Sequence, residues 1–446
     1  MQKSDIARNA IIALVSSALA TAQAQVPATL SLEQARALAR SASPELSAAR
    51  EAVAAARGRE LQAGAFPNPA LAYSTERTSG GGGTNRQQIV GFEQPLELAG
   101  QRGARREAAE LRRRAAQARL ESAQAMLDFE VARAYALAVA AERRAALSRQ
   151  AASAFAEAGR VSQQRLAAGD VSVYADRRLR LEAARYAALE SESVLARRSA
   201  RVALSALVAA STDSISAMSA VLSDSLPFLV PPMSLAILRT VALRARSDYK
   251  EVSLEAEASA AEARVVSRDR IPTPIISAGY KQEDAAGIVE SLNGFAAGFS
   301  IPLPIWDRKK GAVAAADAEG RRAAAEREIV RRRVVQQVAE AHDALLAVEQ
   351  QRAILAPQLG AQSAAALRSA QVAYAEGEVT LLEFLDAVRA YHEAESAYAA
   401  LIGESVIRRA GLERVIGSPL SAIPSLPVAQ SPGMPRTNDI RPEIDR

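Results

Sequence analysis

Side chains that usually perform chemistry are scarce in this sequence of 446 residues. It contains no cysteine, which excludes disulfides, thiolate zinc sites, cysteine nucleophiles and a lipid-modified cysteine. The two histidines, His342 and His392, lie fifty residues apart and have no further ligand at a spacing typical of a metal site. We therefore expect no catalytic residue, no metal site and no cofactor, and the composition argues against an ordinary enzyme.

Two acidic residues, Glu383 and Asp386, form the one remaining pair whose spacing suggests a function. Three positions apart, they share one face of a helix. From the sequence alone, two solvated acids on an ordinary amphipathic helix are the better explanation. The chain as a whole carries 55 basic and 50 acidic residues. Because these charges are evenly mixed, we expect no nucleic-acid partner.

Unusually long helices must position these residues. The segment 98–168 has no proline, whereas 305–376 contains Pro357, where we expect a kink or a break. After Gly377, apolar residues recur at helical spacing, and Leu382 and Leu385 begin a second stripe beside the first. Two stripes indicate contact with two neighbouring helices, as in a ring. Interrupted only by Glu395, the first stripe consists of Leu381, Phe384, Val388, Tyr391, Tyr398 and Ile402.

The chain contains a tandem duplication. Four landmarks recur in the same order 203–208 residues later; for example, Gln94-Pro95-Leu96-Glu97-Leu98 corresponds to Ile301-Pro302-Leu303-Pro304-Ile305. The duplication predicts a first repeat at 25–222 and a second at 223–417, each with a helix, a β-hairpin and two long helices. Expected bounds are a hairpin at about 67–95 with helices 98–168 and 170–210, then a hairpin at about 272–303 with helices 305–376 and 378–415.

The two ends of the chain differ in composition from the part between them. Residues 10–20 are apolar but too short to span a bilayer, and Ala22-Gln23-Ala24 gives a small-x-small cleavage pattern. We therefore expect 1–24 to be a cleaved signal peptide. Six prolines after Gly417 predict a disordered tail over 418–446.

Between the helices, extended segments alternate in polarity. Phe295, Phe299 and Ile301 fall on one face, with small or polar residues on the other. This pattern is typical of a strand between lipid and water, so we expect these three side chains to face lipid. A soluble four-stranded sheet is the alternative. If the strands span a membrane, four of them cannot close a barrel and open edges are not tolerated in lipid; three copies would supply twelve strands.

At its joints and turns the chain resembles the outer-membrane factor family, the TolC-like exit ducts of bacterial tripartite efflux pumps and type I secretion systems. The resemblance covers roughly 30–417. The joints Gln94–Arg102 and Ile301–Arg308 are similar to those of the CzcC-like heavy-metal branch, which typically read QPLELGGKR and IPLPLFDR.

The resemblance implies a mainly α-helical fold with a small transmembrane β part. It implies a homotrimer whose twelve-stranded β-barrel lies in outer-membrane lipid and continues as a long α-helical barrel into the periplasm. A periplasmic adaptor protein and an inner-membrane transporter of the RND class would complete the system. The protein would be a passive exit duct for cobalt-, zinc- or cadmium-type cations, exported by its signal peptide and not lipidated.

The resemblance also implies roles for individual residues. Glu383 and Asp386 match the two acids that ring the closed periplasmic end in the family, where three copies would form two rings of carboxylates. Ala175 and Arg178 occupy the corresponding positions of the first repeat, so the rings are not doubled. Two turns match the adaptor-docking tips; their residues are Gly169, Asp170, Val171 and Ser172, and Gly377, Glu378, Val379 and Thr380.

Several alternatives stay open. The chain could be an outer-membrane duct for drug efflux or type I secretion. A periplasmic adaptor is argued against by the head-to-tail repeat, and a filamentous coiled coil by the proline-bounded alternating segments.

Overall fold

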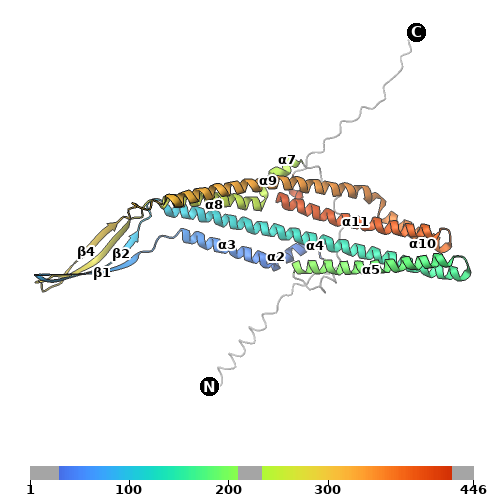
Figure 1. Ribbon diagram of the computed structural model, residues 1–446, viewed down its shortest axis with the longest axis horizontal. Helices are drawn as coiled ribbons and strands as arrows, with labels where there is room; N and C mark the ends of the chain where they lie inside the picture. The colour runs from blue at the N-terminus through green and yellow to red at the C-terminus, as the bar shows by residue number, and fades with distance from the viewer. Residues whose placement is uncertain (1–29, 209–233, 424–446) are drawn as a thin grey trace, which may run out of the picture. The chain divides into compact units, whose positions relative to one another are not determined.

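The computed structural model describes residues 30–208 and 234–423 (Figure 1). The predicted signal peptide, the join between the repeats at 223–232 and the predicted tail beyond Ile423 lie outside these ranges.

Helices dominate the described chain, and the order helix, hairpin, long helices occurs twice (Figure 1). The longest, α4, has 68 residues and is therefore about 100 Å long. Within the described ranges, no helix is both long and apolar enough to cross a bilayer. The helices of the first half are α2 (Leu32–Ala42), α3 (Pro44–Ala63), α4 (Gln101–Ala168) and α5 (Val173–Val208). Those of the second half are α7 (Leu235–Ala245), α8 (Ser247–Arg268), α9 (Lys310–Leu355), η1 (Ala356–Gln358), α10 (Ala361–Glu376), α11 (Leu381–Ile416) and η2 (Leu420–Ala422).

The second long helix is interrupted. Where the sequence predicts one helix over 305–376 with a kink or break at Pro357, the structure has α9, the short 3-10 turn η1 and α10. Pro357 lacks the backbone N–H that a continuing α-helix would need. Gly360 then adopts a positive φ of 82°, a conformation that favours glycine, before α10 begins.

One antiparallel sheet contains the four strands of the described residues, in the order β1-β2-β3-β4. Their bounds are β1 (Ala70–Gly80), β2 (Gly83–Pro95), β3 (Ile275–Asp284) and β4 (Leu292–Ser300). The β2–β3 pair joins the two repeats, and Gly91 lies opposite Gly279 there. A Cβ on Gly279 would come within 2.7 Å of the Val90 carbonyl oxygen, so this approach of the two strands requires glycine.

Cross-strand register collects most of the large apolar side chains on one face of the sheet. Tyr73 pairs with Val90, Val90 with Tyr280, and Tyr280 with Phe295. A parallel row runs from Leu71 through Phe92, Ala278 and Ala297. Since side chains alternate along a strand, Ile89 lies on the opposite face from Val90. The irregular alternation of β2 is therefore compatible with one apolar face.

By its internal contacts the chain divides into two compact units, and each contains parts of both repeats. Among the described residues, one unit consists of 30–42, 134–208 and 359–400, and the other of 43–133, 234–358 and 401–423. Each has an apolar core among its described residues. The first core includes Leu147, Phe155, Leu179, Tyr186, Leu367, Tyr374, Phe384, Leu385, Val388 and Tyr391. The second includes Leu238, Ala242, Val334, Val338, Leu345, Leu412, Val415 and Ile416.

Candidate functional site

The two predicted docking turns have the same local geometry. Gly169 and Gly377 both end a helix in the left-handed conformation, with φ of 85° and 84°. The next residue donates its N–H to a carbonyl five positions back, Asp170 to Arg165 and Glu378 to Ala373, each at 2.8 Å. This pattern is a Schellman-type helix end, and glycine adopts it without a steric penalty.

Side-chain caps start the helices that follow the turns. The Ser172 hydroxyl accepts a hydrogen bond from the Ala175 N–H at 3.1 Å, at the start of α5. The Thr380 hydroxyl accepts one from the Glu383 N–H at 3.3 Å, at the start of α11. Val379 packs against the core of its unit, while Asp170 is exposed. The turns are therefore rigid at their ends and accessible at their tips.

Arg165 connects the two turns. From the last turn of α4 its guanidinium donates to the Tyr374 carbonyl oxygen, at the end of α10, at 3.2 Å. A Cβ built on Gly377 would lie 3.2 Å from an amino group of the same guanidinium. The structure thus brings the predicted tips of both repeats together, through a residue that the sequence did not indicate.

Glu383 completes a capping box at the start of α11. Its carboxylate accepts hydrogen bonds from the Thr380 N–H at 2.7 Å and from the Thr380 hydroxyl at 2.9 Å. The backbone hydrogen bond, and then the hydroxyl, lower the pKa of Glu383. Because the pKa is lower in the folded state, the cap stabilises the fold above the unfolded pKa and is lost as pH falls through the folded pKa.

Apolar packing of α11 turns both predicted gate acids toward solvent. Phe384, between them in sequence, is fully buried. Its ring stacks on Tyr374 at 4.8 Å and meets Phe155 edge-on at 5.8 Å between centroids. Glu383 and Asp386 flank this anchor and are exposed. A single chain therefore presents two carboxylates on the outside of a firmly packed helix.

One further acid on α11 is buried. Glu395, the interruption in the apolar stripe, is 3% exposed. One carboxylate oxygen accepts hydrogen bonds from the Gly360 N–H at 2.7 Å and the Ser363 hydroxyl at 2.5 Å. The other lies 3.6 Å from the Arg143 guanidinium. Glu395 thereby supplies, from α11, the hydrogen-bond acceptor that the start of α10 lacks locally.

The predicted lipid-facing residues lie on or directly after β4. Phe295 is 93% and Phe299 76% exposed in the single chain, and both belong to the apolar face of the sheet. Ile301 follows the last residue of β4 and is also exposed. These side chains are free to contact lipid, and that role stays a prediction.

Neither histidine belongs to a cluster of metal ligands. His392 lies beside the Ser148 hydroxyl at 3.2 Å, and burial lowers its pKa. His342 lies beside Asp343 at 3.1 Å. Among the described residues, no group of three or more His, Cys, Asp or Glu side chains could hold a metal ion.

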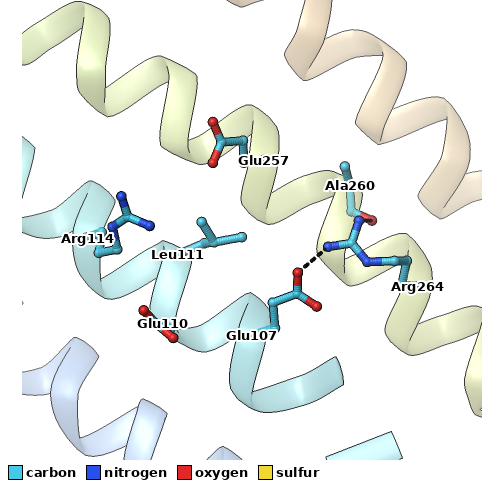
Figure 2. A pocket seen from close by; sticks show the side chains of 7 residues that line it. All are labelled: Glu107, Glu110, Leu111, Arg114, Glu257, Ala260 and Arg264. Atoms are coloured by element: carbon cyan, nitrogen blue, oxygen red, sulfur yellow. Dashed lines mark hydrogen bonds and ion pairs between the residues drawn. The ribbon is translucent and has the colours of Figure 1, made fainter. Parts of the chain in front are cut away.

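A cavity of about 320 Å³ lies between α4 and α8 (Figure 2). Arg264 of α8 donates to Glu107 of α4 across it at 2.7 Å. Three carboxylates and two guanidinium groups line the cavity, so most of their charge is compensated, and we assign it a role in packing. It is lined by Glu107, Glu110, Leu111, Arg114, Glu257, Ala260 and Arg264.

Comparison with known proteins gives consistent similarities. The family model described as "Outer membrane efflux protein" matches residues 35–212 and 238–418. Cobalt-zinc-cadmium resistance protein CzcC of Cupriavidus metallidurans is 28% identical over 393 residues, which cover 87% of this chain and 90% of CzcC. Nickel-cobalt-cadmium resistance protein NccC of Alcaligenes xylosoxydans xylosoxydans is 30% identical over 323 residues, which cover 69% of this chain and 67% of NccC.

A similar fold occurs in solved structures. The outer membrane protein VceC of Vibrio cholerae matches with a TM-score of 0.67 at 20% identity, over 87% of this chain and 96% of that chain. This likeness confirms the mainly α-helical fold with a small antiparallel β part that the sequence predicts.

Proposed function

Because the chain belongs to the outer membrane efflux protein family, we propose that it is the outer-membrane exit duct of a tripartite system that exports heavy-metal cations. The fold and the family are those of passive outer-membrane efflux channels. In this proposal the chain catalyses no reaction, needs no cofactor and works as a homotrimer.

One observation carries the duct proposal. Register places most of the large apolar side chains of the four described strands on one face, where Leu71, Phe92 and Phe299 are exposed. A soluble sheet would bury such a face against another layer. A sheet with lipid on this face and water on the other needs no such layer.

Relatives supply the argument for the cargo. CzcC and NccC are both resistance proteins against divalent transition-metal ions by their names, and CzcC is similar along nearly its whole length. We infer that the cargo here is a cation of the cobalt, zinc or cadmium type. Exposed carboxylates at Glu383 and Asp386 support this proposal, because a ring of them would attract cations electrostatically.

The rest of the proposal concerns place and partners. We propose that the signal peptide exports the chain and that it reaches the outer membrane without lipidation. The tips at Gly169–Ser172 and Gly377–Thr380 would bind a periplasmic adaptor protein, which links the duct to an inner-membrane RND transporter. Their matching rigid geometry supports this role, since two equivalent tips per chain would present six similar sites in a trimer.

Deleting the gene in its native host tests the function. We expect the deletion to lower the tolerated concentration of cobalt, zinc or cadmium salts, and the complete chain to restore it. Sensitivity to hydrophobic drugs serves as the comparison. Unchanged metal tolerance with reduced drug tolerance would instead support the alternative of a drug-efflux duct.

A further inference from the structure

Four connections join the sheet to the helices, and we call them together the collar. They are residues 64–69, 96–100, 269–274 and 301–309, all within one compact unit (Figure 1). Two of these connections overlap the joints that are similar to those of the CzcC-like branch. The side chains of the collar include exposed apolar and basic residues, which a connection between a strand and a helix does not require.

Hydrogen bonds hold the connections of the collar together. The Leu96 N–H donates to the Pro274 carbonyl oxygen at 2.8 Å, and the Gln94 side chain donates to the Pro67 carbonyl oxygen at 3.0 Å. Arg268 donates to the Gly100 carbonyl oxygen at 3.0 Å. The fourth connection follows β4, whose last residue pairs with the start of β3. The collar is therefore a built surface at one end of the sheet.

Large apolar side chains are exposed around the collar. Trp306, the single tryptophan of the chain, is 92% exposed. Each of the four connections contributes at least one such residue. The others are Phe66, Leu98, Ile271, Leu303 and Ile305.

Basic side chains surround these apolar residues. The collar with the adjoining helix ends, residues 64–69, 96–106, 268–274 and 301–310, has eight basic and three acidic side chains. At the opposite end of the sheet, 76–86 and 281–290 have three basic and four acidic ones. The guanidinium of Arg102 lies 3.8 Å from the centre of the Phe66 ring, which shows a cation and an aromatic ring held together. The eight are Arg102, Arg105, Arg106, Arg268, Arg270, Arg308, Lys309 and Lys310.

Aromatic residues with flanking lysine and arginine are typical of the boundary between acyl chains and headgroups. We propose that the collar binds anionic phospholipid headgroups of the leaflet on the helix side, selectively over zwitterionic ones. The inference rests on the proposed membrane position of the sheet. Each lysine or arginine near a membrane surface attracts anionic lipid headgroups. Several such residues together therefore enrich anionic lipid around the collar. The opposite end of the sheet is nearly neutral, so we expect the selectivity only in the leaflet at the collar.

Arg308 and Lys310 are the best residues for testing the proposal. Both are exposed beside Trp306 in sequence, at the start of α9. Arg321 and Arg327, farther along α9, are also exposed basic residues. The variant Arg308→Gln/Lys310→Gln and the control Arg321→Gln/Arg327→Gln each remove two positive charges, the first at the collar and the second farther along α9.

Fluorescence of Trp306 reports the lipid directly. The complete chain is reconstituted in phosphatidylcholine vesicles that contain, at equal mole fraction, either dibrominated phosphatidylglycerol or dibrominated phosphatidylcholine. We expect the brominated anionic lipid to quench Trp306 severalfold more than the zwitterionic lipid, and added salt to reduce the difference. The Arg308/Lys310 variant should lose most of this difference, and the Arg321/Arg327 control should retain it.

Each other outcome has a defined meaning. Equal quenching by both lipids would overturn the selective collar while leaving the membrane position of the sheet intact. Absence of quenching by either lipid would overturn both the collar and the proposed membrane position. Selective quenching that the Arg308/Lys310 variant retains would overturn the assignment to these cations.

Discussion

At the scale of single residues, the two predicted gate acids differ in their local contacts. Glu383 accepts two hydrogen bonds from Thr380 and stabilises the start of α11, whereas Asp386 lies one turn farther along the exposed face. A test of the gate must remove charge without removing the cap. Glutamine serves at position 383, because the capping box accepts Glu or Gln.

We predict that Glu383→Gln/Asp386→Asn reduces the cation preference of the channel in planar-bilayer conductance and its block by multivalent cations. The physical reason is the loss of fixed negative charge at a narrow constriction, an effect that salt screens. Glu376→Gln/Glu378→Gln, which removes two charges at the adjacent turn, is the matched control. Unchanged selectivity and block in the gate variant would make both acids ordinary surface residues.

Glu395 permits a second prediction at this scale. Glu395→Ala leaves the Gly360 N–H and the Ser363 hydroxyl without their acceptor and should lower the free energy of unfolding by about 1–3 kcal/mol. Exposed Glu393→Ala on the same helix is the control. Thermal unfolding and amide hydrogen exchange at the start of α10 would measure the effect. Equal behaviour of the two variants would show that the buried acceptor has no role in holding α10.

At the scale of elements, the apolar face of the sheet determines how substitutions in β4 behave. Phe295→Arg, in the middle of β4, places a charge on that face and should cost about 2–4 kcal/mol near the bilayer midplane. Ala296→Arg places the same side chain on the opposite face and should be tolerated. The amount of protein recovered in the outer-membrane fraction measures both. Similar losses from the two substitutions would contradict the assignment of faces.

Sequence patterns predicted the elements well but not their contacts. Alternation at Phe295 and Phe299, and glycines after long helical segments, are local signals, so the strands and turns follow from them. The pairing of β2 with β3 depends on residues 180–198 positions apart, and the alternation of Ile89 and Val90 alone was ambiguous. The role of Arg165 was not predictable either, because it contacts a backbone carbonyl of the other repeat.

The burial of Glu395 was likewise not predictable from local sequence signals. In the sequence Glu395 only interrupts an apolar stripe. Its role becomes clear from the break in the preceding helix at Pro357 and Gly360. A break in one helix and an acid in the next are separate signals in the sequence. Only their proximity in the fold makes the acid an acceptor for the exposed helix start.

At the scale of the whole molecule, the edges of the sheet predict the assembly. In the described chain β1 pairs only with β2 and β4 only with β3, so each has one unpaired side. Unpaired backbone N–H and C=O groups are not tolerated in lipid. Pairing β4 of one copy with β1 of the next is a heterologous contact that repeats until a ring closes.

We predict a ring of three copies, because three four-stranded sheets give twelve strands and single chains of four cannot close. Light scattering of the detergent-solubilised protein should give three chain masses. Phe295→Arg, if extracted folded, should keep this mass, since the substituted side chain points away from the strand edges. A stable monomer or dimer that retains its β-structure would contradict the closed ring, because such a species would leave the edges of β1 and β4 open in the membrane.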